Sequence, residues 1–320
     1  MTNKFTITCC GSLALLLSAG AAQASCGSAF CVLNTNWSTQ GVASEPGAFR
    51  LDERFEFVDQ KHLQSGTKRI SAADDTADTT ELRTINRNLL TTLDYTVSKN
   101  WAVSVSVPVV SRSHSHIDDP TGAATFEKWD FSKVGDTRVL GMYRFDNEKN
   151  PVASQGLIFG LKLPTGDYRV SNADDKEAER ALQPGTGSTD VVVGGYYSAP
   201  GMHLDSSWFV QALYQQAVST KEEYKPGNQL QLNVGYRYPL GQDWQALLQV
   251  NSLIKGKDSG ANAEPDLSGS KSVFLSPGLI YSLTHDLQLY SFVQLPIYRN
   301  YNGTQLSVDW AFVAGATMRF

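Results

Sequence analysis

Trp310-Ala-Phe-Val-Ala-Gly-Ala-Thr-Met-Arg-Phe320, the final stretch of the 320-residue sequence, alternates between two kinds of side chain. Counting back from the terminal phenylalanine, every second residue is apolar, and the residues between them include small and polar ones. The apolar set is Met318, Ala316, Ala314, Phe312 and Trp310, and the other set includes Arg319, Thr317 and Gly315. A terminal aromatic residue with one apolar face predicts the closing strand of an outer-membrane β-barrel. The last strand of a soluble β-sandwich alternates in the same way, so the rest of the chain has to distinguish the two.

Residues at the start of the sequence predict export. Lys4 precedes the apolar stretch 13–17, and Ala22-Gln23-Ala24 fits an A-x-A cleavage site. We therefore expect residues 1–24 to be a secretory signal peptide.

Residues 25–47 show little alternation, and we expect a periplasmic N-terminal segment or a plug that folds into the barrel. This segment holds Cys26 and Cys31, which are expected to form a local disulfide in an oxidising compartment. A metal or haem site is the alternative, but no C-x-x-C-H motif or nearby histidine supports it.

Twelve segments of the remaining chain alternate with a period of two, and most are long enough to cross a bilayer at the tilt of a barrel strand. In the first, Phe49, Leu51 and Phe55 fall on one face, and the residues between them are charged. The segments are 48–59, 88–95, 101–109, 136–145, 157–163, 190–197, 208–215, 230–238, 244–251, 273–282, 287–295 and 310–320. They predict an all-β fold, a 12-stranded antiparallel transmembrane β-barrel over residues 48–320.

The connections between these segments alternate in length, which favours a barrel over a sandwich. The long connections are 60–83, 113–134, 166–187, 217–228, 255–271 and 298–305, and the short ones are 97–100, 147–153, 199–205, 239–243 and 283–286. Outer-membrane barrels have short periplasmic turns and longer outer loops, and a sandwich has no reason for this order.

A 12-stranded barrel should enclose a narrow lumen lined by the inward-facing residues of each strand. The phase of the alternation predicts that the pore-lining cations are Arg50, Arg54, Arg138, Arg144, Lys162, Arg237 and Arg319, and that the pore-lining acids are Asp52, Glu56, Asp94, Asp136 and Asp190. Rings of cations can favour anionic solutes. Pairing of these charges across strands is the expected alternative for most of them.

The histidines give weak support to an enzyme. His114 and His116 lie on one face of an extended segment, with Asp118 and Asp119 after them, so they could hold a divalent metal or assist a nearby serine. A polar, solvated loop explains the same residues. We expect no enzyme activity, no catalytic residues, no metal and no cofactor.

Three segments resemble a known group of proteins. Gly160-Leu-Lys-Leu-Pro-Thr-Gly-Asp-Tyr168, Leu182-Gln-Pro-Gly-Thr-Gly-Ser-Thr-Asp190 and Gln294-Leu-Pro-Ile-Tyr-Arg-Asn-Tyr-Asn-Gly303 are similar to the outer-membrane transporter family associated with degradation of phenol by the meta pathway. The resemblance is best over residues 130–320. It implies a barrel that takes up or exports small solutes, and it implies no catalysis.

Together these features predict a channel or transporter for small solutes, including aromatic or other organic compounds, in the outer membrane of a Gram-negative bacterium. The expected partners are outer-membrane lipid, the solute, and the barrel-assembly machinery, which would bind the strand that ends in Phe320. A net charge of −5 argues against nucleic acid. The alternative is a structural barrel whose cysteine segment scaffolds a periplasmic redox or metal-handling partner.

Overall fold

The computed structural model describes residues 45–72, 79–119, 123–146, 152–203 and 205–320. Within these ranges the chain is all-β apart from two short 3₁₀ turns, η4 (Arg180–Leu182) and η5 (Pro265–Leu267). No helix among the described residues is long and apolar enough to cross a membrane. The predicted signal peptide, nearly all of the predicted N-terminal segment and the Cys26–Cys31 pair lie outside the described residues.

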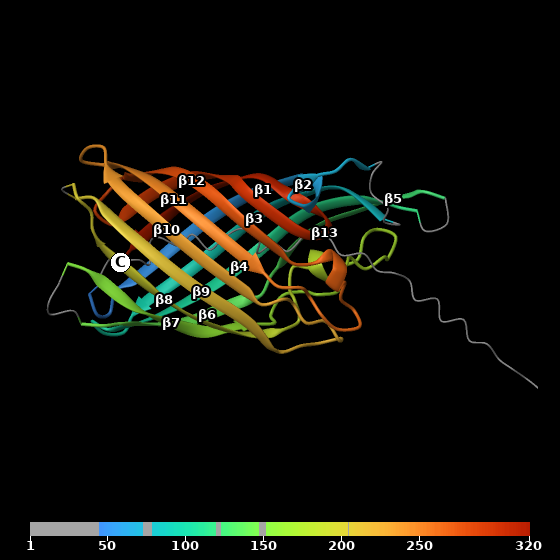
Figure 1. The fold of residues 1–320 in the computed structure, drawn as a ribbon. Coiled ribbons are helices and arrows are strands. Elements are labelled where there is room, and N and C mark those ends of the chain that lie inside the picture. Colours follow the sequence, from blue (N-terminus) through green and yellow to red (C-terminus); the bar gives the residue numbers. More distant parts are fainter. Residues whose placement is uncertain (1–44, 73–78, 120–122, 147–151, 204) are drawn as a thin grey trace, which may run out of the picture.

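The strands form one closed antiparallel barrel (Figure 1). Eleven assigned strands make up the ring, each paired with the next and β1 paired with β13, and β2 and β5 lie outside it. The ring strands are β1 (Phe49–Gly66), β3 (Thr79–Thr96), β4 (Trp101–Asp118), β6 (Thr137–Arg144), β7 (Ser154–Leu163), β8 (Thr189–Pro200), β9 (Ser207–Ser219), β10 (Gln229–Pro239), β11 (Trp244–Lys255), β12 (Ser270–Ser282) and β13 (Leu287–Arg319). The other two are β2 (Lys68–Arg69) and β5 (Thr125–Val134).

β13 crosses the barrel twice, which brings the number of crossings to the predicted twelve. Its 33 residues would span about 110 Å as one extended strand. Instead, the backbone N–H of Arg319 donates to the backbone oxygen of Asp286 at 2.9 Å, so the two ends of the element lie together. The reversal lies near Gly303, whose φ of +67° suits a glycine turn. Its first half pairs with β12, and its second half pairs with β1 and closes the barrel.

The outer surface of the barrel is apolar, as a lipid-facing surface requires. Large apolar side chains are exposed along the strands, for example Leu89, Val103, Phe159, Leu232 and Val250. Such a continuous exposed apolar surface would be unstable in water. The alternation of the sequence therefore places one set of side chains toward lipid and the other set inside the barrel.

Aromatic side chains gather at the end of the barrel with the short turns, in the arrangement of a membrane-interface girdle. Ring centroids lie 4.9 Å apart for Trp101 and Tyr143 and 4.6 Å apart for Trp244 and Tyr281. Phe320 stacks on Phe49 at 5.9 Å, which joins the last strand to the first at this end.

At the opposite end, the structure differs from the predicted loops. β1 continues to Gly66, β4 continues to Asp118, and β5 pairs with the upper part of β4, so much of the predicted loop 113–134 is a β-hairpin. The predicted connection 298–305 is a tight turn within β13. These extensions were missed because they lie beyond the apolar band, where neither face of a strand needs to be apolar.

Candidate functional site

Eleven of the twelve charged residues predicted to line the lumen lie on inward positions of their strands, and Asp136 lies in the short connection between β5 and β6. Eight are buried: Arg50, Asp52, Arg54, Glu56, Asp94, Asp136, Lys162 and Asp190. Four are partly buried: Arg138, Arg144, Arg237 and Arg319. Their contact with a passing solute stays a prediction.

Four inward charges of β1, Arg50, Asp52, Arg54 and Glu56, follow one another along the lumen and are called the charged strip here. Arg50 pairs with Asp94 of β3 at 2.7 Å, and Arg54 pairs with Glu56 at 2.6 Å. Asp52 accepts hydrogen bonds from Tyr290 at 3.0 Å and Thr317 at 2.6 Å. The charges of the strip are therefore balanced by contacts within and between strands.

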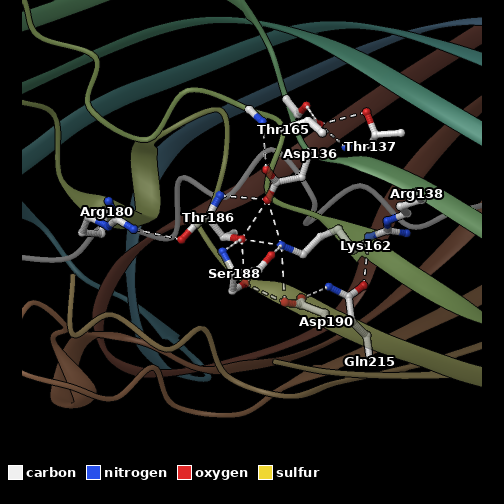
Figure 2. Close-up of polar contacts among 12 residues, drawn as sticks. Asp136, Thr137, Arg138, Lys162, Thr165, Arg180, Thr186, Ser188, Asp190 and Gln215 are labelled. Atoms are coloured by element: carbon white, nitrogen blue, oxygen red, sulfur yellow. Dashed lines mark hydrogen bonds and ion pairs between the residues drawn. The ribbon is translucent and has the colours of Figure 1, made fainter. Parts of the chain in front are cut away.

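A second set of buried charges lies near the loop end, where β6, β7 and β8 meet (Figure 2). The Lys162 cluster comprises Asp136, Lys162, Thr186, Ser188 and Asp190. Lys162 Nζ donates to Asp136 Oδ2 at 2.8 Å and to the backbone oxygen of Ser188 at 2.8 Å, and it also bonds Thr186 Oγ1. Asp190 Oδ1 lies 3.4 Å from the same nitrogen. An ammonium group with a 1 % exposed side chain requires this many partners to remain charged.

The Lys162 cluster ties both ends of connection 164–188 to the barrel. Asp136 accepts from the backbone N–H of Gly166 at 3.1 Å and from that of Thr186 at 2.9 Å. A Cβ atom on Gly185 would lie 2.6 Å from the backbone oxygen of Gly166, so the two backbone segments are in direct contact. This close approach explains Gly166 of the Pro-Thr-Gly segment and Gly185 of the Pro-Gly-Thr-Gly segment, because a side chain on either would clash.

Connection 164–188 also reaches across to β4 and β5. Arg112, an inward residue of β4, donates to the backbone oxygen of Leu182, which is fully buried. Trp129 of β5 donates through Nε1 to the backbone oxygen of Lys176 at 2.9 Å. This connection therefore covers the β4–β8 side of the loop end.

Two further loops pack against this connection and complete what we call the cap, residues 164–188, 220–228 and 256–269. Arg180 donates to Glu222 at 3.2 Å, and Asn262 donates to the backbone oxygen of Glu222 at 2.7 Å. Asn302, in the turn of β13, donates to the backbone oxygen of Asp266 at 2.9 Å. The cap is thus joined to the barrel on several sides.

His114 and His116 take part in a polar chain at the same rim. Thr84 Oγ1 lies 2.8 Å from His114 Nδ1, and His114 Nε2 lies 3.3 Å from His116 Nδ1. His116 Nε2 in turn lies 3.5 Å from the carboxylate of Glu127. Glu127 in turn binds Lys176 of the cap and raises the pKa of that lysine through their hydrogen bond. Among the described residues, no group of three or more histidine, cysteine or acidic side chains is placed to hold a metal ion.

The inner surface also has an extensive apolar part, whereas the predicted pore-lining residues are all charged. Two clusters of buried side chains make up this apolar wall: Phe209, Leu247, Ile280, Tyr290, Phe292 and Val313 in one, and Ile158, Val192 and Leu213 in the other, with Leu140, Met142 and Tyr196 packed against the second. They come from inward positions of β6 to β9 and β11 to β13, and the first cluster lies toward the short-turn end.

Inward glycines allow the large side chains of the apolar wall to lie flat on neighbouring strands. Phe209 is paired with Gly235, where a Cβ atom would lie 2.4 Å from its ring. A Cβ on Gly315 would lie 2.5 Å from the Tyr290 ring. The rings therefore occupy the space of absent side chains instead of projecting across the lumen. No single strand reveals this arrangement, because the glycine and the ring lie on different strands.

A belt of amides lies between the first cluster of the apolar wall and the loop end. Asn233 donates to Gln211 at 3.3 Å, Asn251 donates to Asn233 at 2.9 Å, and Ser276 donates to Asn251 at 2.7 Å. This ladder runs across β9, β10, β11 and β12. The interior thus combines the charged strip, the apolar wall, the amide belt and the cap.

Comparison with known proteins shows the family to which this chain belongs. Residues 86–311 match the family model described as "Putative MetA-pathway of phenol degradation". No curated protein matches the chain. Both sequence motifs that build the Lys162 cluster lie inside the matched range.

Solved structures of outer-membrane proteins align with this chain. The COG4313 outer membrane channel from Pseudomonas putida F1 aligns with a TM-score of 0.64 at 12 % identity, over 88 % of this chain and 98 % of that one. The transport unit of the autotransporter AIDA-I from Escherichia coli aligns with a TM-score of 0.47 at 9 % identity, over 92 % and 95 % of the two chains. A FadL homologue from Pseudomonas aeruginosa aligns with a TM-score of 0.43 at 10 % identity, over 88 % and 96 %. The first likeness establishes an outer-membrane barrel fold.

Proposed function

We propose that this chain is an outer-membrane channel for small organic solutes, aromatic compounds among them. It belongs to the family described as "Putative MetA-pathway of phenol degradation". The observation that carries this proposal is the apolar wall beside the charged strip inside one narrow barrel. The interior of a general porin is polar. A lumen with large flat apolar side chains suits a solute that has an apolar ring and a polar group.

The polar parts of the interior have a complementary role in this proposal. The charged strip and the amide belt offer hydrogen bonds to the polar group of the solute, while the apolar wall contacts its ring. The cap, held by the Lys162 cluster, restricts entry from the loop end. The chain transports its solute without chemical change, so we assign it no catalytic residue.

We place the short turns and both ends of the barrel sequence in the periplasm and the cap outside the cell. The apolar outer surface then contacts outer-membrane lipid, with the aromatic girdle at the periplasmic interface. The scaffold alternative depends on Cys26 and Cys31, which lie outside the described residues.

The barrel-assembly machinery is a further proposed partner, through the strand that ends in Phe320. Deletion of Phe320 is expected to lower the amount of protein in the outer membrane several-fold, because the ring that closes the barrel against Phe49 is lost. Quantitative immunoblotting of outer-membrane fractions measures this effect. Phe145→Ala removes another exposed aromatic residue of the same end and should leave the level nearly unchanged. Equal loss in both variants would mean that Phe320 acts only as a member of the girdle.

Planar-bilayer recording tests the proposed function. The purified full chain should give small single-channel steps, because packed side chains and the cap narrow its interior. Adding a single-ring aromatic solute should reduce this ion current, since the solute occupies the apolar wall. A large current that the aromatic solute does not change would contradict the proposal.

A further inference from the structure

The three loops of the cap enclose a pocket that none of the roles above uses. Its volume is about 800 Å³, and all three loops of the cap contribute to it. Its smallest lining side chains are Ala178 and Ala181 from the first loop and Ala261 and Ala263 from the third. Four methyl groups leave room for a ligand and provide an apolar floor.

The side chains around this pocket are held firmly in place. The Arg180 guanidinium lies over the rings of Tyr168 and Tyr224, at 4.7 Å and 5.1 Å from their centroids. Glu222 and Glu223 both have left-handed backbone conformations, with φ of +54° and +49°, which cost energy in residues other than glycine. Such strain persists only where the surrounding contacts enforce it, as the hydrogen bond from Asn262 does here.

Two buried polar atoms of this pocket lack a hydrogen-bond partner among the described residues. One is Glu264 Oε2, and the other is Arg180 Nε. Burial alone raises the pKa of Glu264 to about 7, and burial lowers the pKa of Arg180. An unpartnered buried polar atom is costly, so both atoms stand to gain from a ligand that bonds them.

The charges around Glu264 restrict the class of ligand. They are Arg169, Glu177, Glu179, Arg180, Glu222 and Glu223. Glu222 forms ion pairs with both arginines, with Arg180 at 3.2 Å and also with Arg169. The remaining carboxylates give the pocket a negative excess, which repels anions. A hydroxyl group both accepts and donates, so it can bond Arg180 Nε–H as well as the Glu264 carboxyl.

We propose that this pocket binds neutral, hydroxyl-bearing small molecules within the cap. A carboxylate is repelled there, and an apolar molecule leaves both buried atoms without partners. Arg180 also donates to the backbone oxygen of Thr186 at 2.9 Å, so the pocket adjoins the Lys162 cluster (Figure 2). The site goes beyond the proposed conduction, and binding to it can be measured whether or not the lumen conducts.

Ligand-observed NMR on the full chain in nanodiscs tests this proposal with three compounds that share one ring. Benzyl alcohol should bind at least tenfold more tightly than benzoate, which is charged, and than toluene, which has no hydroxyl group. Equal affinity for all three compounds would overturn the proposal, as would preference for benzoate.

Substitutions at Glu264 separate the pocket from the lumen. Glu264→Ala should weaken benzyl alcohol binding about tenfold, or roughly 1.4 kcal/mol. In the wild type, affinity should rise several-fold between pH 6 and 8, because the ionised carboxylate accepts a stronger hydrogen bond. Glu264→Gln should retain binding and lose this pH dependence. Asp266→Asn, at a highly exposed carboxylate two residues away, is the matched control and should change neither property.

Failure of this site and failure of the channel give different results. Binding that is unaffected by Glu264→Ala, in a variant that keeps the heat-modifiable gel mobility of a folded barrel, would overturn the pocket and leave the conduction experiment untouched. A barrel that does not conduct but binds benzyl alcohol in a Glu264-dependent way would retain the pocket and reject the channel.

Discussion

Replacing Lys162 by methionine is expected to raise the single-channel conductance several-fold. The substitution leaves the buried carboxylates of Asp136 and Asp190 without their shared ammonium partner, and breaking a buried pair in this way costs about 3–5 kcal/mol. Because Asp136 also accepts from the backbone of Gly166 and Thr186, both ends of connection 164–188 lose a fixed attachment. The strands of the barrel keep their hydrogen bonds, so the cap loosens while the barrel persists. Recording of purified protein in planar bilayers measures the change.

Lys133→Met is the matched control for this substitution. Lys133 pairs with Asp167 of the same connection at 3.5 Å, but both side chains are about half exposed. Exposed pairs contribute about 0–1 kcal/mol, so conductance should stay at the wild-type value. Limited proteolysis should cut within 164–188 faster in Lys162→Met than in Lys133→Met. Unchanged conductance in a correctly folded Lys162→Met variant would show that the Lys162 cluster does not hold the lumen closed.

Gly235→Ala is expected to reduce conduction and the uptake of aromatic solutes several-fold. The added Cβ atom would lie 2.4 Å from the Phe209 ring, which is far too close for two non-bonded carbon atoms, so the ring has to move. The strand backbone lies on one side of the ring, and the free direction is toward the lumen. The displaced ring then obstructs the space beside the apolar wall. Conductance and solute uptake, compared between this variant and the Gly141→Ala control, provide the measurement.

Gly141→Ala makes the same chemical change on the outer surface. A Cβ atom there would lie 3.1 Å from the exposed Phe159 ring, which can shift toward lipid by a few tenths of an ångström. This variant should conduct like the wild type. If both alanine variants conducted equally, the apolar wall would have no part in the solute path.

The alternation of the sequence was sufficient to predict the strands because lipid on one side and polar groups on the other impose a strict period of two. The pairing of the last strand with residues 48–59 follows from closure of the ring, and the structure shows it, with Leu51 opposite Met318 and Phe57 opposite Phe312. The strand extensions past the membrane have no lipid-facing side. Their residues lack the period, and the prediction ended the strands too early there.

The candidate site could be predicted only in part, for a different physical reason. Inward charges such as Lys162 and Asp190 follow from the phase of each strand, but their partners Thr186 and Ser188 come from an irregular connection. The apolar wall could not be predicted because an apolar Phe209 on an inward position conflicts with the alternation. The conflict is resolved only by Gly235, its partner on the next strand. Contacts between strands and between loops therefore carry the information that alternation within one strand lacks.

Uptake by intact cells tests the central claim most directly, because the lipopolysaccharide of the outer membrane slows entry of hydrophobic solutes without a channel. Gram-negative cells that express the full chain should take up a single-ring aromatic solute from dilute solution several times faster than cells that do not. Cells that express Gly235→Ala at the same outer-membrane level should lose most of this gain. Equal uptake with and without the protein, at confirmed outer-membrane levels, would contradict the account.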